Sequence, residues 1–167
     1  MTIALKPFVG DVSWLRQALT DLGHPELSLS ILNTDCWPTL SPKYWSWPDD
    51  VQEALTQAMI RCGNPDHLFD YCEFINDRED VWRALVETNC GTTCGLYCGA
   101  VRDRDEMRKV LIENGDAYDL LGYCTDVSDR DDVREAMIAK GDDYVCSIYR
   151  KRFGKDATIK QEEAPHV

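Results

Sequence analysis

The sequence predicts an all-α protein, a short right-handed solenoid of about five antiparallel helical hairpins. The main evidence is a tyrosine that recurs every 26 residues, at Tyr71, Tyr97, Tyr123 and Tyr149. Around each tyrosine, matching residues fall at the i, i+3, i+4, i+7 spacing that is typical of one helix face. Because a hairpin of two short helices cannot cover its own apolar face, a pattern with this fixed period indicates stacked repeats.

The pattern divides the chain into three parts. Residues 1–48 are expected to form a helical pair, 11–22 and 25–33, followed by a capping loop rich in proline and tryptophan. Residues 49–153 are expected to form four helical-hairpin repeats. Residues 154–167 lack apolar periodicity, which is typical of a disordered tail. The N-terminal pair is interpreted as an atypical terminal repeat.

Each repeat should begin with a first helix that ends at a glycine. The expected first helices are 50–61, 79–89, 105–114 and 131–140, and the glycines are Gly63, Gly91, Gly115 and Gly141. Glycine readily takes the left-handed conformation that closes a helix, so we expect that conformation at all of them. The second helices carry the tyrosines, and their expected N-caps are Asn64, Thr92, Asp116 and Asp142.

Acidic residues gather in the turns that join one repeat to the next, 76–80, 102–106 and 128–132, which we call the acidic turns. These acids are Asp77, Glu79, Asp80, Asp103, Asp105, Glu106, Asp129, Asp131 and Asp132. The first acid of each turn is expected to be a helix N-cap, and the others suit the positive end of the helix dipole. The same residues are candidates for binding a partner with a basic surface.

An arginine also recurs in each acidic turn, at Arg78, Arg104 and Arg130. One interpretation is a ladder in which each arginine pairs with a carboxylate of the adjacent copy, for about 0–1 kcal/mol per exposed pair. The other is an edge that holds the acidic groups of a partner.

A second candidate for partner binding is the aromatic loop, which holds Trp37, Tyr44, Trp45 and Trp47 between prolines. These side chains could fold back over the first repeat and seal its end. They could instead be exposed anchors, since Trp and Tyr are enriched among the residues that dominate binding energy at interfaces.

The cysteines indicate a cytoplasmic protein with reduced thiols. Cys72, Cys98 and Cys124 occupy equivalent helix positions, and neighbouring helices lie about 8–10 Å apart, too far for a disulfide. Cys90 and Cys94 share a helical spacing with Cys98, which leaves zinc or redox chemistry as a distant alternative. The sequence shows no motif for catalytic residues, and no cofactor or metal is expected.

Charge sets the class of partner. The net charge is −12, which argues against direct binding of nucleic acid or of an anionic membrane and favours a basic protein partner. No apolar run is long enough for a membrane span, and the first residues do not form a signal-peptide pattern.

The Asp-Arg openings of the repeats and the glycines between their helices resemble the short helical-hairpin relatives of HEAT-like repeat proteins. This resemblance covers residues 49–153 and implies a binding scaffold rather than an enzyme. In size and charge the chain also resembles phage and mobile-element counter-defence proteins, including anti-CRISPR proteins. That resemblance implies an inhibitor that occupies a basic nucleic-acid-binding surface as a nucleic-acid mimic, and the alternative is a scaffold or adaptor that bridges proteins.

Overall fold

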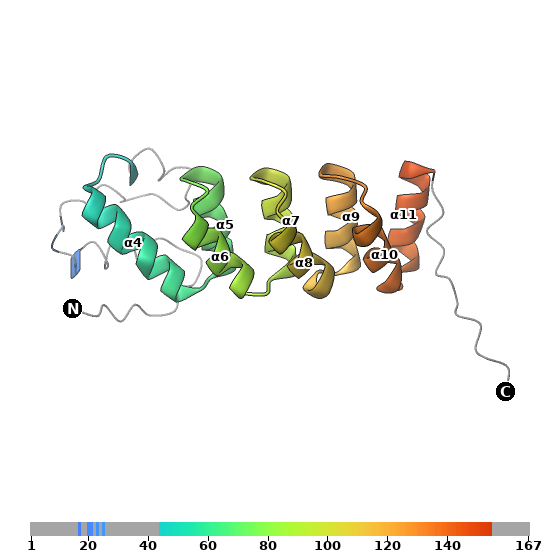
Figure 1. Cartoon of the computed structure of the whole chain (residues 1–167), viewed down its shortest axis with the longest axis horizontal. Coiled ribbons are helices and arrows are strands. Elements are labelled where there is room, and N and C mark those ends of the chain that lie inside the picture. The colour runs from blue at the N-terminus through green and yellow to red at the C-terminus, as the bar shows by residue number, and fades with distance from the viewer. Residues whose placement is uncertain (1–16, 18–19, 22, 24, 26–43, 155–167) are drawn as a thin grey trace, which may run out of the picture. The chain divides into compact units, whose positions relative to one another are not determined.

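The computed structural model describes residues 17, 20, 21, 23, 25 and 44–154 (Figure 1). The structure of these residues is all-α, with eight helices, α4 to α11. The chain divides into two compact units, Met1–Thr88 and Asn89–Val167. Most of the expected helical pair 11–22 and 25–33, together with Trp37 and residues 155–167, lies outside the described residues.

The described part of the N-terminal unit contains three helices: α4 (Asp49–Cys62), α5 (Pro65–Phe74) and α6 (Glu79–Glu87). Helix α5 packs most extensively against α6, and α4 contacts both. As predicted, α4 ends at Gly63 in the left-handed conformation, with φ 65°. Asn64 caps α5 by accepting hydrogen bonds from the next two free backbone N–H groups, and Pro65 takes the first helical position.

The C-terminal unit contains the remaining helices in its described part. They are α7 (Gly91–Ala100), α8 (Asp105–Asn114), α9 (Ala117–Asp126), α10 (Asp131–Ala139) and α11 (Asp143–Phe153). Helix α9 contacts both α7 and α11, whereas α8 contacts α10, so alternate helices form two rows. The stacking of successive copies that the 26-residue period predicts is confirmed within this unit.

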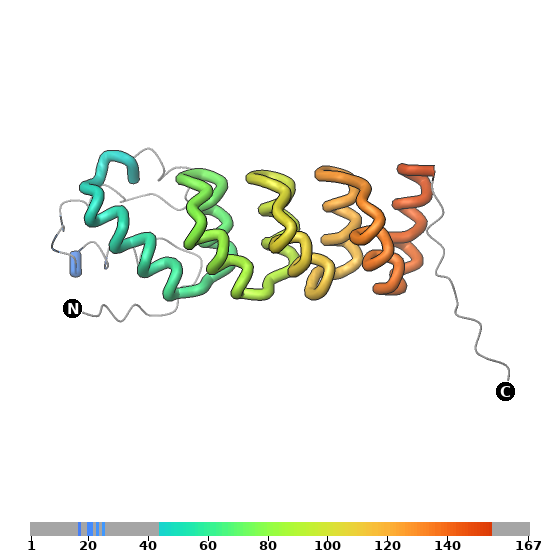
Figure 2. The backbone as a smooth tube through the Cα atoms, in the orientation of Figure 1, coloured from blue at the N-terminus to red at the C-terminus, as the bar shows by residue number. Residues whose placement is uncertain are grey.

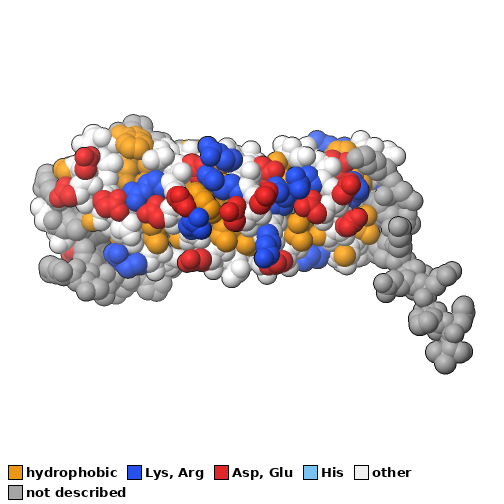
Figure 3. All heavy atoms as spheres, viewed as in Figure 1, with side chains coloured by type: hydrophobic (Ala, Val, Ile, Leu, Met, Phe, Trp, Pro, Cys, Tyr) orange, Lys and Arg blue, Asp and Glu red, His pale blue; other side chains and the backbone are white. Residues whose placement is uncertain are grey.

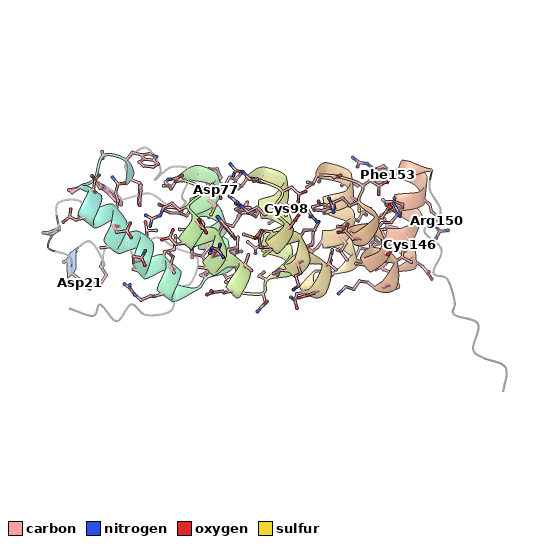
Figure 4. All side chains as sticks on the ribbon, viewed as in Figure 1. Asp21, Asp77, Cys98, Cys146, Arg150 and Phe153 are labelled. Carbon is pink, nitrogen blue, oxygen red and sulfur yellow. The ribbon has the colours of Figure 1, made fainter. Side chains whose placement is uncertain are left out.

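The tyrosines form the centre of the core, as predicted. Tyr71, Tyr97, Tyr123 and Tyr149 are at most 2% exposed. The expected burial of Cys72, Cys98 and Cys124 is confirmed as well, and the structure holds them as thiols. Figure 4 shows Cys98 and Cys146 among the packed helices of the C-terminal unit. We call α5, α7, α9 and α11 the tyrosine helices.

The closest helix pairs are offset by one helix from the predicted hairpins. Each of α5, α7 and α9 packs most extensively on the helix that follows it, through an acidic turn (Figure 2). These turns share one conformation: the carbonyl of the tyrosine accepts two backbone N–H groups, four and five residues later. The helices themselves were predicted well, since the four first helices match their expected ranges to within two residues.

Two of the four predicted glycine closures are wrong. Gly141 is left-handed, but Gly115 is extended and Gly91 is the first residue of α7, with Asn89 in the left-handed conformation instead. Thr92 is therefore inside α7 and is not its N-cap. The physical reason for glycine here is close backbone approach, because a Cβ atom on Gly91 would lie 2.2 Å from the backbone nitrogen of Gly115.

Candidate partner-binding site

The first acid of each acidic turn is not the helix N-cap, which corrects the prediction for Asp77, Asp103 and Asp129. The N-caps are the arginines that follow them, and these make no side-chain capping bond. Asp103 accepts a hydrogen bond from the Tyr123 hydroxyl at 2.9 Å, and Asp129 accepts one from Tyr149 at 2.6 Å. These carboxylates face the buried tyrosines because the tyrosine hydroxyls need acceptors when they leave water.

A buried arginine completes this arrangement in the C-terminal unit. The side chain of Arg108 is only 7% exposed and donates to Asp103 at 2.8 Å and to Asp105. Its Nε lies 3.7 Å from Asp132 in the next turn. Burial alone would lower the pKa of Arg108, but hydrogen bonds to Tyr123 and Asp105 hold that pKa above its ordinary value. Arg108 occupies the same position in the 26-residue period as buried Thr56 and Trp82 in the earlier copies. The apolar pattern did not reveal this equivalence.

Most other acids of the acidic turns are also paired within the chain. Their ion pairs are Glu79 with Arg83, Asp80 with Arg78, Asp131 with Arg134 and Asp132 with Arg130. Glu106 is exposed. The face in view in Figure 3 accordingly shows acidic and basic side chains interspersed. The acidic turns thus present fewer unpaired carboxylates than their composition suggests.

The predicted arginine ladder holds in part. Arg78 donates to Glu53 of the preceding copy at 2.7 Å, and this bond lowers the pKa of Glu53. Arg130 pairs instead with Asp132 of its own copy. Arg104 donates to the hydroxyl of Tyr97 at 2.7 Å.

The aromatic loop is divided between the core and the surface. Tyr44 and Trp47 are 2% and 3% exposed, and the Tyr44 hydroxyl lies 2.8 Å from the Thr56 hydroxyl. Burial raises the pKa of Tyr44, and the edge of its ring meets Tyr71. Trp45 is 54% exposed, so among the described residues of this loop it is the aromatic side chain that a partner could reach.

A groove that the sequence did not reveal lies between α7 and α9 of the C-terminal unit. We call it the α7–α9 groove; its volume is about 420 Å³. It is lined by Thr92, Gly95, Leu96, Gly99, Ala100, Tyr118, Asp119, Gly122, Tyr123, Asp126 and Val127. Two glycines leave this space open: a Cβ atom on Gly122 would meet nothing within 4 Å, and one on Gly99 would touch only Val127.

The walls of the groove are apolar and its charge is negative. Leu96 and Tyr118 are 55% and 54% exposed, which is unusual for large apolar side chains. Asp119 accepts hydrogen bonds from the Thr92 hydroxyl and from the Asp116 backbone, and Asp126 accepts one from Thr125. Neither α7 nor α9 contains a lysine or an arginine. The groove is therefore a candidate site for a cationic ligand with apolar parts.

The sequence contains a signal for this groove in its helical glycines. Gly95, Gly99 and Gly122 lie inside helices, where glycine is unfavourable by roughly 1 kcal/mol relative to alanine. Gly99 on one helix and Gly122 on the next tyrosine helix remove side chains from a shared interface. The missing side chains leave a groove only because α7 packs against α9.

Metal binding has little support in the part of the chain that the structure describes. Within it, no group of three or more His, Cys, Asp or Glu side chains could hold a metal ion. Burial raises the pKa of the Cys94 thiol to about 12 and that of Cys98 to about 11, which disfavours the thiolate that binds zinc. Burial also lowers the pKa of His67.

The fold and groove define a class of protein: an all-α chain of short helices, packed in sequential pairs, with an acidic apolar groove between two of them. Comparison with protein-family models, curated proteins and solved structures found no match to the chain. Among the described residues, no helix combines the length and the apolar character that a membrane span requires.

Proposed function

We propose that this chain is a non-enzymatic binding protein for a partner with a basic surface. The observation that carries the proposal is the placement of its negative charge. On α9, acids occur without any basic residue, and the adjacent α7 carries no charged residue, whereas the acidic turns neutralise most of their acids with arginines. With a net charge of −12, the chain would attract a basic partner at long range.

The narrower form of this proposal is an inhibitor that occupies a nucleic-acid-binding surface of its target. Such a surface is basic, and it would be attracted by the same charge that repels nucleic acid. Because ion pairs within the acidic turns occupy their carboxylates, these turns are a poor mimic of a row of phosphates. Contact through the tyrosine helices is therefore favoured. The finer architecture that we propose is a right-handed, HEAT-like solenoid of about five hairpins. Its two rows of helices would present the carboxylates of the tyrosine helices together.

A scaffold or adaptor function is the second candidate. The observation in its favour is the exposure of large apolar side chains, namely Trp45, Leu96, Tyr118 and Tyr144. Several such positions on one chain suit contacts with more than one protein. Zinc or redox chemistry has less support, because burial keeps Cys94 and Cys98 in the thiol form.

The test is capture of partners from the native host on immobilised full-length chain, with elution in steps of rising salt. The proposal expects a basic protein that is released by moderate salt, because screening weakens exposed charge pairs. Nucleic acid added as a competitor should displace an inhibited target but leave a scaffold complex intact. Capture only of partners that resist salt would contradict the proposal.

A variant of the acidic turns locates the contact. Replacing Glu79 with Gln and Asp105 and Asp131 with Asn removes three charges that are 70%, 90% and 82% exposed. If the acidic turns bind the target, this triple variant should lose affinity while melting nearly as the wild type does. Retained affinity would place the contact on the tyrosine helices or at Trp45.

A further inference from the structure

We propose that the α7–α9 groove binds a short basic segment of the partner protein, with the head of an Arg or Lys at Asp126 and its apolar neighbours on Leu96 and Tyr118. The inference rests on the proposed function and assigns the site and the chemistry of its occupant. A segment of protein, rather than a flat surface, is indicated because the groove is a hollow between two helices.

The shape of the groove suits a long aliphatic side chain that ends in a cation. Its floor is formed where Gly99 and Gly122 lack side chains. A volume of about 420 Å³ holds a few side chains at most. Arg and Lys bury their methylene stems along apolar surface while keeping the charged group at a polar rim. The acids of this groove stand at such a rim.

The neighbouring interface between α9 and α11 provides an internal comparison. There the position of Gly99 is taken by Thr125, one period later, so a side chain stands where α7 has none. The position of Asp126 is taken by Arg152, whose guanidinium lies 3.4 Å from the carbonyl oxygen of Thr125. The chain thus supplies its own cation at α9–α11. At α7–α9 an acid stands in the same register, so a cation that binds there would come from another molecule.

The carboxylates of the groove retain capacity to accept hydrogen bonds. The Thr92 hydroxyl and the Asp116 backbone N–H both donate to the Oδ2 atom of Asp119, and the Thr125 hydroxyl donates to the Oδ1 atom of Asp126. Within the described residues, neither aspartate forms an ion pair. This differs from the acidic turns, where arginines occupy most carboxylates.

The exposed ring of Tyr118 adds a second contact for a cation. A guanidinium or ammonium over a tyrosine face gains electrostatic attraction, and Tyr is enriched among residues that dominate binding energy. Leu96 offers an apolar surface on the opposite helix, so an apolar residue next to the cation would leave water there. Together these features specify a basic residue flanked by apolar residues.

The experiment measures binding of the purified full-length chain to an array of short synthetic peptides. Each peptide carries one Arg or Lys flanked by varied apolar residues, and matched peptides carry Gln or Glu in place of the cation. The variants are Gly122→Leu, which fills the groove, and Asp126→Asn, which removes a charge from it. The control is Glu135→Gln on α10, an exposed acid in the other row of helices.

These variants should fold. A Cβ atom at Gly122 meets nothing within 4 Å, and leucine is a stronger helix former than glycine. Asp126 is the last residue of α9, where negative charge is unfavourable to the helix dipole. Thermal melting of each variant checks this expectation.

The wild type and Glu135→Gln are expected to bind the cationic peptides, and Gly122→Leu and Asp126→Asn to bind them at least about tenfold more weakly. If the Gln peptides bind as well as the cationic peptides, the assignment of a basic occupant is overturned. If no peptide binds, the assignment of the groove as a binding site is overturned. A dimer of the wild type that Gly122→Leu converts to a monomer would assign the groove to a second copy and overturn the inference.

Failure of this inference is distinguishable from failure of the proposed function. If Gly122→Leu still captures a basic partner in a salt-sensitive manner, the function stands and the groove assignment falls. If even the wild type captures no such partner, the proposed function falls as well.

Discussion

At the scale of residues, the tyrosines are more than apolar filling, because each must find a partner for its hydroxyl. Tyr123 donates to Asp103, and both contact buried Arg108. Burial raises the pKa of Tyr123 to about 12, so it stays a neutral donor at physiological pH. An aspartate that looks like a helix cap in the sequence is therefore the acceptor of a buried polar network.

Asp103→Asn should destabilise the protein, because Arg108 would lose a counter-charge while remaining buried. The expected cost is about 1–3 kcal/mol, the range for a buried polar group that loses its partner. Asp105→Asn is the matched control: Asp105 also bonds Arg108 but is 90% exposed, so its loss should cost about 0–1 kcal/mol. Urea unfolding of both variants measures the difference, and equal stability of the two would contradict the network.

At the scale of elements, helix α7 shows why glycine had to be interpreted in two ways. The sequence predicted a left-handed closure at Gly91, as is found at Gly63. Gly91 instead starts a helix whose backbone meets that of Gly115. Sequence spacing gave the existence and length of the helices, because apolar periodicity is local. It could not show close backbone approach or the α7–α9 groove, because both depend on how separate helices pack.

Gly91→Ala and Gly122→Ala should therefore have opposite effects, although both glycines are helical. A methyl group at position 91 would collide with the backbone of Gly115, and overpacking of this kind costs roughly 1–3 kcal/mol or more. At position 122 the methyl group meets no atom, so the gain in helix propensity should stabilise by roughly 0.5–1 kcal/mol. Thermal or urea unfolding tests this pair. Similar destabilisation by both substitutions would refute the close approach as the reason for Gly91.

At the scale of the whole molecule, burial of equivalent cysteines follows the same 26-residue period as the tyrosines. The period predicted this burial at Cys72, Cys98 and Cys124, and the prediction is confirmed. The period did not predict which helices would pair most closely. The acidic turns are short and bring α5 onto α6, α7 onto α8 and α9 onto α10, a preference decided by turn geometry.

Thiol labelling should report this burial across both units. Cys62 is exposed and should react quickly in the native protein, which makes it an internal standard. Cys72, Cys98 and Cys124 should react only as the protein unfolds, and burial raises the pKa of Cys98 to about 11, which further slows its reaction. Mass spectrometry of labelled peptides over time assigns the sites. Rapid native labelling of all three would contradict the packed core.

The offset between the predicted hairpins and the closest helix pairs also bears on how such a chain gains or loses copies. A break within an acidic turn would separate two helices that pack extensively, whereas a break before a tyrosine helix would separate fewer contacts. The boundary between the two compact units, at Thr88 and Asn89, falls before a tyrosine helix. Recombination that duplicates or deletes one 26-residue copy should therefore be tolerated best with its junctions near 63–64, 89–90, 115–116 and 141–142, where each inserted segment begins with a tyrosine helix and ends with its packed neighbour.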